Sequence, residues 1–469
     1  MKESKSLPGH EAGAASSGSL APFLLRGGGA TLSARLIAVG AGLAVQMLLA
    51  RLLEPAGVGA FFLTQSVVAL VALVAQLGLP RMVVREVARA LGSGRPGLAR
   101  GTVRASVKIA AVGVGGAALV YAFVLGPWLA ESVFESPLMA ATSSVAAVWV
   151  VAIACQSLGG EVLRGARHVG AASVFGGAGA LGSAMTAAIL GAILIGRGSS
   201  TLSEVILVSV GSALTSFLLA SVVIRWRLGG VTEQVAARTL LAGTTAMLIS
   251  NISHTGAAQS DLWIVGAMLT DTDVAVYGAA KRLMRLVSLP MVIVSLVVPP
   301  VIADLHHRGQ HERLERIIRG VSTLAGLPSL GILAVFLLSS ELVLGLVYGP
   351  FYASGAFILA VLSVERILFV WAGPAGMTLM MTGHERRMMV VTLLTGMLEV
   401  VAIVIGTYLG GGRGAALGFL VGSGLRSVAT WNEARRAVGL RTDVNFFDLR
   451  ESSMPLRRLF RVGRDERRR

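Results

Sequence analysis

Long apolar stretches recur along almost the whole chain and leave little of it for a water-soluble domain. Between Ala30 and Ala434, twelve stretches reach membrane-spanning length, and only short polar connections separate them. A helix needs ~20 mostly apolar residues to cross the hydrocarbon core of a bilayer. The sequence therefore predicts an all-α polytopic membrane protein. The expected spans are 30–53, 57–79, 105–127, 139–162, 170–195, 202–224, 240–268, 274–298, 321–347, 355–381, 388–409 and 414–434.

Composition supports this class of protein. Hydrophobic residues make up 54% of the chain and charged residues 14%, whereas a soluble domain is usually about 25% charged. The 58 glycines include many inside apolar stretches, where small residues let membrane helices approach closely. Cys155 is the only cysteine, so the chain forms no internal disulfide and no cysteine-based metal site. We expect no cofactor and no metal.

The distribution of basic residues predicts the orientation. Of the 41 Lys and Arg residues, 32 lie in the segments on one side of the predicted spans and 3 in the loops on the other side. Because basic loops stay in the cytoplasm, both termini are expected there, in a bacterial inner membrane. Topology also explains the net charge of +16, so nucleic acid is not an expected partner. The segment 1–22 reads as a disordered tail and 441–469 as a basic tail on anionic membrane lipids.

A weak internal repeat divides the spans into two groups of six. At an offset of 216 residues, Leu53 matches Leu269, Val58 matches Val274 and Phe61 matches Tyr277. Parallel six-helix repeats are a known transporter design, with the binding site between the halves. We therefore expect two pseudo-symmetric bundles, 23–230 and 231–440, around a central cavity.

Four short motifs resemble those of polysaccharide flippases. LLEPAGVGAF (52–61) is similar to their loop after the first helix, and LGLPRMVVREVA (77–88) to the end of their second helix. DLWIVG (261–266), followed by VYGAAKRL (276–283), resembles their "D-x-x-l-l-G…G-x-Y-x-x-A-x-R-l" hairpin, and PVIA (300–303) their exit from the eighth helix. The match departs at Ala275, where the family often has Gly.

These motifs and the helix count resemble the polysaccharide-transporter branch of the multidrug/oligosaccharidyl-lipid/polysaccharide exporter superfamily. The resemblance implies a flippase that moves polyprenyl-diphosphate-linked oligosaccharides from the inner to the outer leaflet by alternating access. A polyprenyl-diphosphate-linked glycan is then the expected partner, and a polysaccharide polymerase and glycosyltransferases are candidate partners.

Ionisable residues inside predicted spans are costly and usually face a cavity or a partner. Six are basic and three acidic, so the set carries a net charge of +3. A cavity that accepts a diphosphate needs this sign, whereas a pump for cationic drugs favours the opposite. The nine residues are Arg35, Asp261, Lys281, Arg282, Arg285, Glu365, Arg366, Glu399 and Arg426.

The seventh and eighth spans carry the sharpest hypothesis. Asp261 lies ten residues before the turn at Asp271 and Lys281 ten after it, so both fall about 15 Å from that end of their helices, near mid-membrane. Lys281 and Arg285 share one helix face. They are candidates for binding diphosphate, with Asp261 setting their charge state. The alternative is a structural Asp261–Lys281 pair that only joins two helices.

Other polar positions are open to more than one interpretation. Arg282 and Arg426 are further candidates for substrate binding, as is Arg35, although Arg35 is better explained by snorkelling to the membrane surface. His254 falls near the face of Asp261 and is a candidate for coupling.

Glu365 and Glu399 are also candidates for coupling. Glu365 and Arg366 are adjacent and are expected to point ~100° apart, so that they cannot share one partner. Glu399 and Arg426 lie at similar depth, as a structural pair or as a proton-linked element.

Three functions compete at this point. The first is the flippase, and the second is an ion-coupled multidrug or metabolite antiporter of the same superfamily. The third is a membrane enzyme or an assembly factor for polysaccharide. No phosphate-binding loop of the G-x-x-x-x-G-K-S/T type occurs, and no connection is long enough for a catalytic domain. We therefore expect a transporter rather than an enzyme.

Overall fold

The computed structural model describes residues 20–177, 179–228, 233–236, 240, 244–295 and 298–444, and these form helices and connecting loops without strands. The helices of the first half are α1 (Leu20–Leu52), α2 (Pro55–Ala75), α3 (Leu79–Gly92), α4 (Pro96–Val120), η1 (Tyr121–Leu125), α5 (Gly126–Trp128), η2 (Leu129–Val133), α6 (Pro137–Ala141), α7 (Ser143–Gly165), α8 (Val169–Phe175), α9 (Ala180–Arg197) and α10 (Leu202–Arg227). Those of the second half are α12 (Thr244–Met268), α13 (Asp271–Val294), α14 (Val298–His307), α15 (His311–Tyr348), η3 (Pro350–Gly355), α16 (Ala356–Ala372), α17 (Ala375–Met381) and α18 (Glu385–Val438).

The predicted all-α membrane fold is confirmed. Among the described residues, nine helices are long and apolar enough to cross a membrane. α18 counts once among them, although the backbone leaves the helical range at Gly410 and Gly411 and divides the helix into two arms. α12 and α13 are 25 and 24 residues long but carry more polar side chains. The count of twelve spans stays a prediction.

Some element boundaries differ from the sequence-based ones. α1 begins at Leu20, ten residues before the predicted span 30–53, so it enters the predicted tail 1–22, of which residues 1–19 lie outside the described part. The predicted span 355–381 is broken between α16 and α17. The break falls where Gly373 has a positive φ of 67° and Pro374 follows it, and proline cannot donate to the helical ladder.

The last described residues, up to 444, pack against the helix bundle. The Thr442 hydroxyl donates a hydrogen bond of 2.7 Å to the backbone carbonyl of Ala372, at the end of α16. The described start of the predicted basic tail 441–469 is therefore fixed to the helix bundle, and residues 445–469 lie outside the described part.

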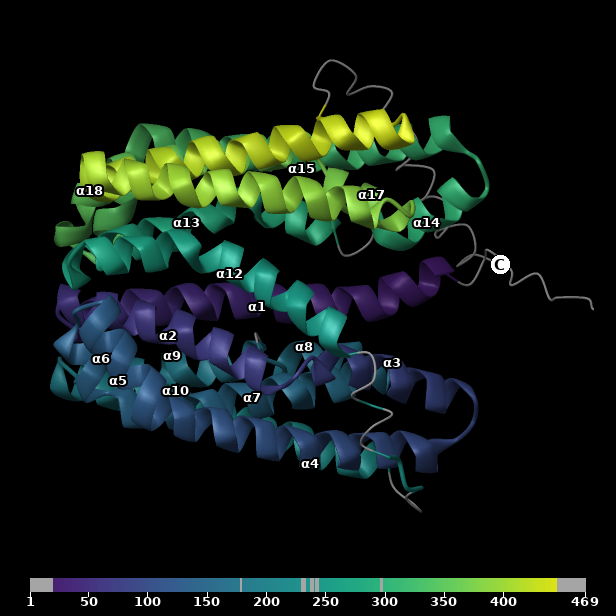
Figure 1. Ribbon diagram of the computed structural model, residues 1–469, viewed down its shortest axis with the longest axis horizontal. Helices are drawn as coiled ribbons and strands as arrows, with labels where there is room; N and C mark the ends of the chain where they lie inside the picture. Colours follow the sequence, from purple (N-terminus) through teal and green to yellow (C-terminus); the bar gives the residue numbers. More distant parts are fainter. Residues whose placement is uncertain are drawn as a thin grey trace, which may run out of the picture.

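The helices gather in two groups (Figure 1). α2 to α10 lie in one group and α13 to α18 in the other, with α1 and α12 between them. α12 contacts both α2 and α18, and α1 contacts both α9 and α15. The division into bundles 23–230 and 231–440 is a proposal that agrees with this arrangement.

The two ends of the bundle differ in how the groups meet. We call the end with the α12–α13 turn the Asp271 end and the opposite end the Arg308 end. The largest apolar core contains residues from both groups, such as Phe62 of α2 and Tyr277 of α13. Toward the Arg308 end, by contrast, one cluster around Leu79 lies near the first group and another around Ile302 belongs to the second. The largest core that both groups share therefore lies toward the Asp271 end, and the described clusters toward the Arg308 end are smaller.

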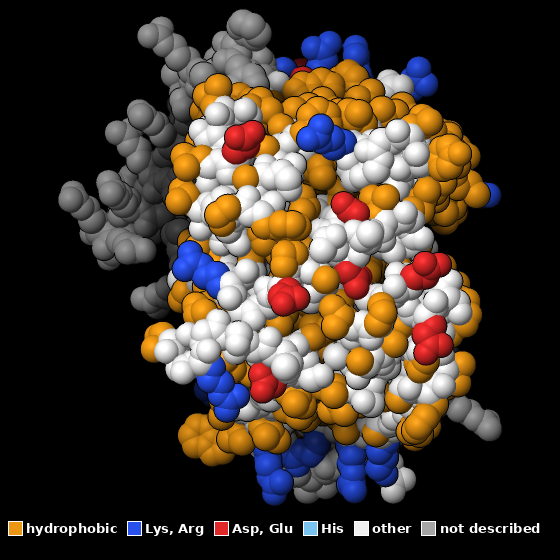
Figure 2. Space-filling model, turned by 90° about the vertical axis from the view of Figure 1, so that its left-hand side faces the viewer, with side chains coloured by type: hydrophobic (Ala, Val, Ile, Leu, Met, Phe, Trp, Pro, Cys, Tyr) orange, Lys and Arg blue, Asp and Glu red, His pale blue; other side chains and the backbone are white. Residues whose placement is uncertain are grey.

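Close backbone contact seals the Asp271 end. A Cβ atom on Gly59 of α2 would lie 1.8 Å from the backbone oxygen of Asp271, so only glycine fits at this crossing. The hydroxyl of Ser136, from the same group as Gly59, donates a hydrogen bond of 2.7 Å to the Asp271 carboxylate. Figure 2 shows this end, where carboxylates are spread among apolar and uncharged side chains.

Candidate functional site

The α12–α13 hairpin places an ion pair inside the protein. A capping box at Thr270 and Asp273 starts α13 directly after the turn, because the two side chains satisfy backbone N–H groups that the first helical turn leaves free. The Lys281 ammonium then meets the Asp261 carboxylate across the hairpin. The expected contact between these two residues is present.

Both members of this pair have their polar atoms satisfied. The Tyr277 hydroxyl donates a hydrogen bond of 3.0 Å to the second carboxylate oxygen of Asp261, and Lys281 Nζ donates one of 2.8 Å to the carbonyl of Ala258. The exposed fraction is 0% for Asp261 and 3% for Lys281. A buried pair with this set of partners joins two helices firmly, and removing one member strands the charge of the other.

Arg285 lies one helical turn after Lys281 but has a different environment. Its side chain is exposed, and within the described chain it makes no hydrogen bond or ion pair. Its electrostatic neighbours Asp261, Tyr348 and Arg366 come from α12, α15 and α16. Charged and polar side chains of three helices of the bundle therefore lie near its guanidinium. Lys281 and Arg285 were predicted to share one face of α13. Of these two, Lys281 is held in an ion pair, whereas Arg285 is the cation that forms none within the described chain.

Arg282 connects the two groups of helices. It donates a hydrogen bond of 2.9 Å to Gln65 of α2, and its guanidinium carbon lies 3.4 Å from the centre of the Phe62 ring. Its partners carry no negative charge, so the positive charge of Arg282 stays uncompensated by an ion pair. In this conformation Arg282 fastens α13 to α2.

A second charged network lies between α16 and the two arms of α18. Arg366 binds the carboxylate of Glu365 with both its Nε and Nη2 atoms, and Ser423 donates to the same carboxylate at 2.5 Å. Arg426 donates to the Ser423 hydroxyl at 2.9 Å and forms an ion pair of 2.6 Å with Glu399. The prediction that Glu365 and Arg366 point apart was wrong, because the long Arg366 side chain folds back onto its neighbour. The Glu399–Arg426 contact is present.

The three pairs explain the excess of positive charge. Asp261, Glu365 and Glu399 are each paired with a base. The remaining three of the nine intramembrane charges are Arg35, Arg282 and Arg285, and none forms an ion pair in the described part of the chain. The net charge of +3 read from the sequence therefore resides on three identified guanidinium groups.

Two predicted positions lie apart from this arrangement. Arg35 is exposed on α1. His254 is exposed on α12, seven residues or ~10 Å along the helix from Asp261, and it makes no hydrogen bond among the described residues. No three His, Cys, Asp or Glu side chains in that part of the chain are grouped to hold a metal ion.

Several partners in the site were not predicted from the sequence. Tyr277 donates a hydrogen bond to the carboxylate of Asp261, and Ser423 donates one to that of Glu365. Their spacing carried a signal, since Tyr277 lies four residues before Lys281 and Ser423 three before Arg426, on the same helix face. Tyr348, buried at the end of α15 near Arg282 and Arg285, comes from a distant helix and has no such signal.

Comparison with known proteins places these features in context. The family model described as "Polysaccharide biosynthesis protein" matches residues 24–306, which is more than half of the 469-residue chain. A curated protein of Haloferax volcanii, "Probable low-salt glycan biosynthesis flippase Agl15", is 24% identical over 237 residues. That match covers 47% of this chain and about half the length of the relative, 50%.

Solved structures share the fold at low sequence identity. A multidrug resistance MATE family transporter of the MOP superfamily in an inward-facing conformation has a TM-score of 0.69 at 17% identity, over 87% of this chain and 98% of that one. The outward-facing conformation of such a transporter has a TM-score of 0.58 at 17% identity, over 87% and 95%. A MOP superfamily transporter from Pyrococcus furiosus, whose description states a "reverse polarity of binding pocket", has a TM-score of 0.55 at 15% identity, over 87% and 95%.

Proposed function

Because the chain belongs to the polysaccharide biosynthesis protein family, a polysaccharide-transporter family of the MOP superfamily, we propose that it is a lipid-linked oligosaccharide flippase. It moves a polyprenyl-diphosphate-linked glycan from the inner to the outer leaflet of a bacterial inner membrane for surface polysaccharide synthesis. The curated relative that it matches is described as a probable glycan flippase, which supports this class of substrate.

The observation that carries the proposal is the open guanidinium of Arg285. A diphosphate that passes through a low-dielectric cavity needs compensating positive charge, since an unpaired charge there costs several kcal/mol. The positive charge of Arg285 is not used in an ion pair within the described chain, whereas that of Lys281 is paired with Asp261. We therefore propose that Arg285 makes the first contact with the diphosphate. Lys281 instead positions α13, and with it Arg285, through its pair with Asp261.

The other cations have different proposed roles. Arg282 is held by Gln65 and becomes available to the diphosphate when α13 moves away from α2. Arg35, exposed on α1, offers a contact on the other side of the space between the groups. Arg426 is paired with Glu399, so we assign it to the α16–α18 joint rather than to the cargo.

The smaller apolar clusters toward the Arg308 end fit the proposed direction. Connections that are rich in Lys and Arg, such as 80–108 and 304–319, lie toward the Arg308 end, and basic connections are expected in the cytoplasm. We infer that this end is the one that opens to the cytoplasm, where the glycan lipid is assembled. Rocking of the bundles 23–230 and 231–440 opens the Asp271 end, and both termini remain cytoplasmic. Glycosyltransferases and a polymerase that supply and consume the glycan are the proposed partners.

A flipping assay with a matched pair of variants tests the proposal. In vesicles that contain a polyprenyl-diphosphate oligosaccharide, Arg285→Gln should lower the flipping rate at least tenfold at unchanged protein abundance, and Arg285→Lys should keep part of the activity. Arg104→Gln removes an exposed charge outside the site and serves as the control. Equal flipping by Arg285→Gln and Arg104→Gln would refute the assignment of Arg285, and no flipping by the unchanged protein would refute the function.

A multidrug antiporter is the second candidate, because the structural likeness with a TM-score of 0.69 is to a multidrug transporter. Three guanidinium groups that form no ion pair within the described residues oppose a cationic drug in the proposed cavity. Expression in a strain sensitive to ethidium separates the two functions. We expect no gain in ethidium resistance, and a gain that Arg285→Gln increases would favour the antiporter.

A further inference from the structure

The fold of α18 creates a groove on the outside of the protein. Its two arms, 385–409 and 412–438, run antiparallel and touch backbone to backbone. A Cβ atom on Gly414 would lie 1.9 Å from the carbonyl oxygen of Gly406, and one on Gly418 2.3 Å from that of Ala402. Small residues at four-residue spacing permit such contact between membrane helices. Because the seam consists of glycines and Ala402, the larger residues beside it form walls around a floor of small residues.

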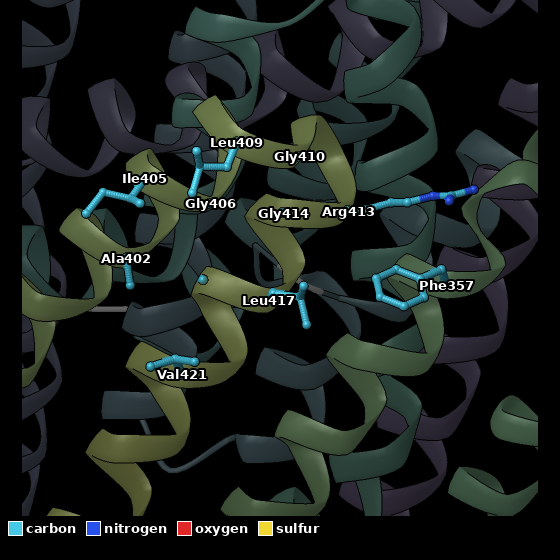
Figure 3. Close-up of a pocket in the computed structure, with 11 residues that line it drawn as sticks. Phe357, Ala402, Ile405, Gly406, Leu409, Gly410, Arg413, Gly414, Leu417 and Val421 are labelled. Atoms are coloured by element: carbon cyan, nitrogen blue, oxygen red, sulfur yellow. The ribbon is translucent and has the colours of Figure 1, made fainter.

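The groove has the size and lining of a site for hydrocarbon. Its volume is about 610 Å³, and Figure 3 shows Gly406 and Gly414 between Leu409 on one arm and Leu417 on the other. The exposed fraction is 77% for Leu409 and 46% for Leu417. These side chains lie within predicted spans, so the exposed surface faces the hydrocarbon of the bilayer and not water.

One cation stands at the mouth of the groove. Arg413 follows the Gly410–Gly411 turn at the Asp271 end, and its guanidinium carbon lies 5.9 Å from the centre of the Phe357 ring. It is exposed and forms no ion pair with any described residue. Arg197 at the same end is bound at 3.5 Å by Glu204. Arg413 is thus the basic group at this groove that is available to an anion at the membrane boundary.

The dimensions match one leaflet. From Arg413 to Val421 the second arm rises ~12 Å at 1.5 Å per residue, and half of a ~30 Å hydrocarbon core is ~15 Å. A groove of this length that begins at a cation accommodates a single acyl chain below its headgroup. A polyprenyl chain is several times longer, so most of it would remain outside.

We propose that this groove binds an anionic phospholipid, with one acyl chain along the floor of small residues of α18 and the phosphate at Arg413. A guanidinium forms strong charge-assisted hydrogen bonds with phosphate oxygens. The groove does not include Arg285, so the proposed site is separate from the proposed diphosphate contact. A bound lipid would fix the angle between the two arms of α18, and through the second arm the position of Ser423 and Arg426.

Native mass spectrometry of the purified full-length chain in detergent tests the proposal with phosphatidylglycerol as the probe. We expect one retained phosphatidylglycerol per chain and at least tenfold weaker retention of phosphatidylcholine. Arg413→Gln should lower retention at least tenfold and Arg413→Lys should keep most of it. Leu417→Trp, which fills the groove, should act like Arg413→Gln.

Two control variants make the test specific. Arg197→Gln removes a cation at the same end, and Leu218→Trp adds a ring on the lipid face of α10, where Leu218 is 62% exposed. Both should retain the lipid. No retained lipid, equal retention of the two phospholipids, or equal loss in the control variants would overturn the site. Stoichiometric displacement by polyprenyl phosphate would overturn its assignment to a phospholipid.

Discussion

The Asp261–Lys281 pair gives a prediction whose size follows from its burial. In Lys281→Met the carboxylate of Asp261 keeps the hydrogen bond from Tyr277 but loses its counter-ion in a site where it is 0% exposed. Breaking a buried pair by removing one partner costs about 3–5 kcal/mol. At about 1.4 kcal/mol per factor of ten, the ratio of folded to unfolded protein should fall roughly 100- to 4,000-fold.

A second substitution separates the lost contact from the stranded charge. In the double variant with Asp261→Asn, the amide oxygen still accepts the Tyr277 hydrogen bond, and no ion remains buried. Replacing both members of a buried pair by neutral groups is often close to neutral. The double variant should therefore regain more than half of the stability lost in Lys281→Met.

The measurement is unfolding of the purified protein in detergent, followed by intrinsic tryptophan fluorescence. Arg285→Met is the matched control, because Arg285 is exposed and forms no ion pair in the described chain, and it should unfold like the unchanged protein. Equal stability of Lys281→Met and Arg285→Met, or a double variant no more stable than Lys281→Met alone, would refute the reasoning. Regained export in the double variant would show that Lys281 acts through Asp261 and does not contact the cargo.

Two further predictions concern the Asp271 end. Gly59→Leu should force this end apart, because even a Cβ would lie 1.8 Å from the Asp271 carbonyl oxygen. Spin labels on the two hairpins that meet there should show a longer distance. An unchanged distance would contradict the close contact between Gly59 and Asp271. Burial raises the pKa of Asp271 despite the hydrogen bond from Ser136, which lowers it, so the closed end binds a proton more readily than a solvated carboxyl does. Closure should therefore be favoured as the pH falls through this raised pKa and weakened as the pH rises through it, and Asp271→Asn should remove that pH dependence of the label distance.

The sequence predicted what depends on local spacing. The length of the apolar stretches predicted membrane-spanning helices. The equal distance of Asp261 and Lys281 from the turn at Asp271 predicted their contact. Both predictions follow from the geometry of the helix. Pro374 indicated a kink in the span 355–381, but the full break at Gly373 depends on the positive φ of that glycine, which hydropathy does not encode. The Glu365–Arg366 contact was missed because Cβ directions do not limit a flexible arginine.

Contacts between distant segments were beyond this reasoning. Gln65 and Arg282 are 217 residues apart, and nothing local to either one selects the other. The same holds for the exposure of Arg285, which depends on how α12, α15 and α16 pack against α13. Sequence reasoning therefore found the charged residues of the site but gave Lys281 and Arg285 one role, whereas the structure separates a paired base from an open one.

The uneven apolar core has a consequence for the transport cycle. Opening the Asp271 end must expose part of the largest core, which both helix groups share, whereas the clusters that the described residues form toward the Arg308 end are smaller. The empty carrier should therefore rest open at the Arg308 end, and the return step after release should run downhill. A cargo that reverses a population from 1:99 to 99:1 must prefer the other state by about 5.5 kcal/mol. Substitutions in that core, such as at Phe62, should change turnover although they never touch the cargo.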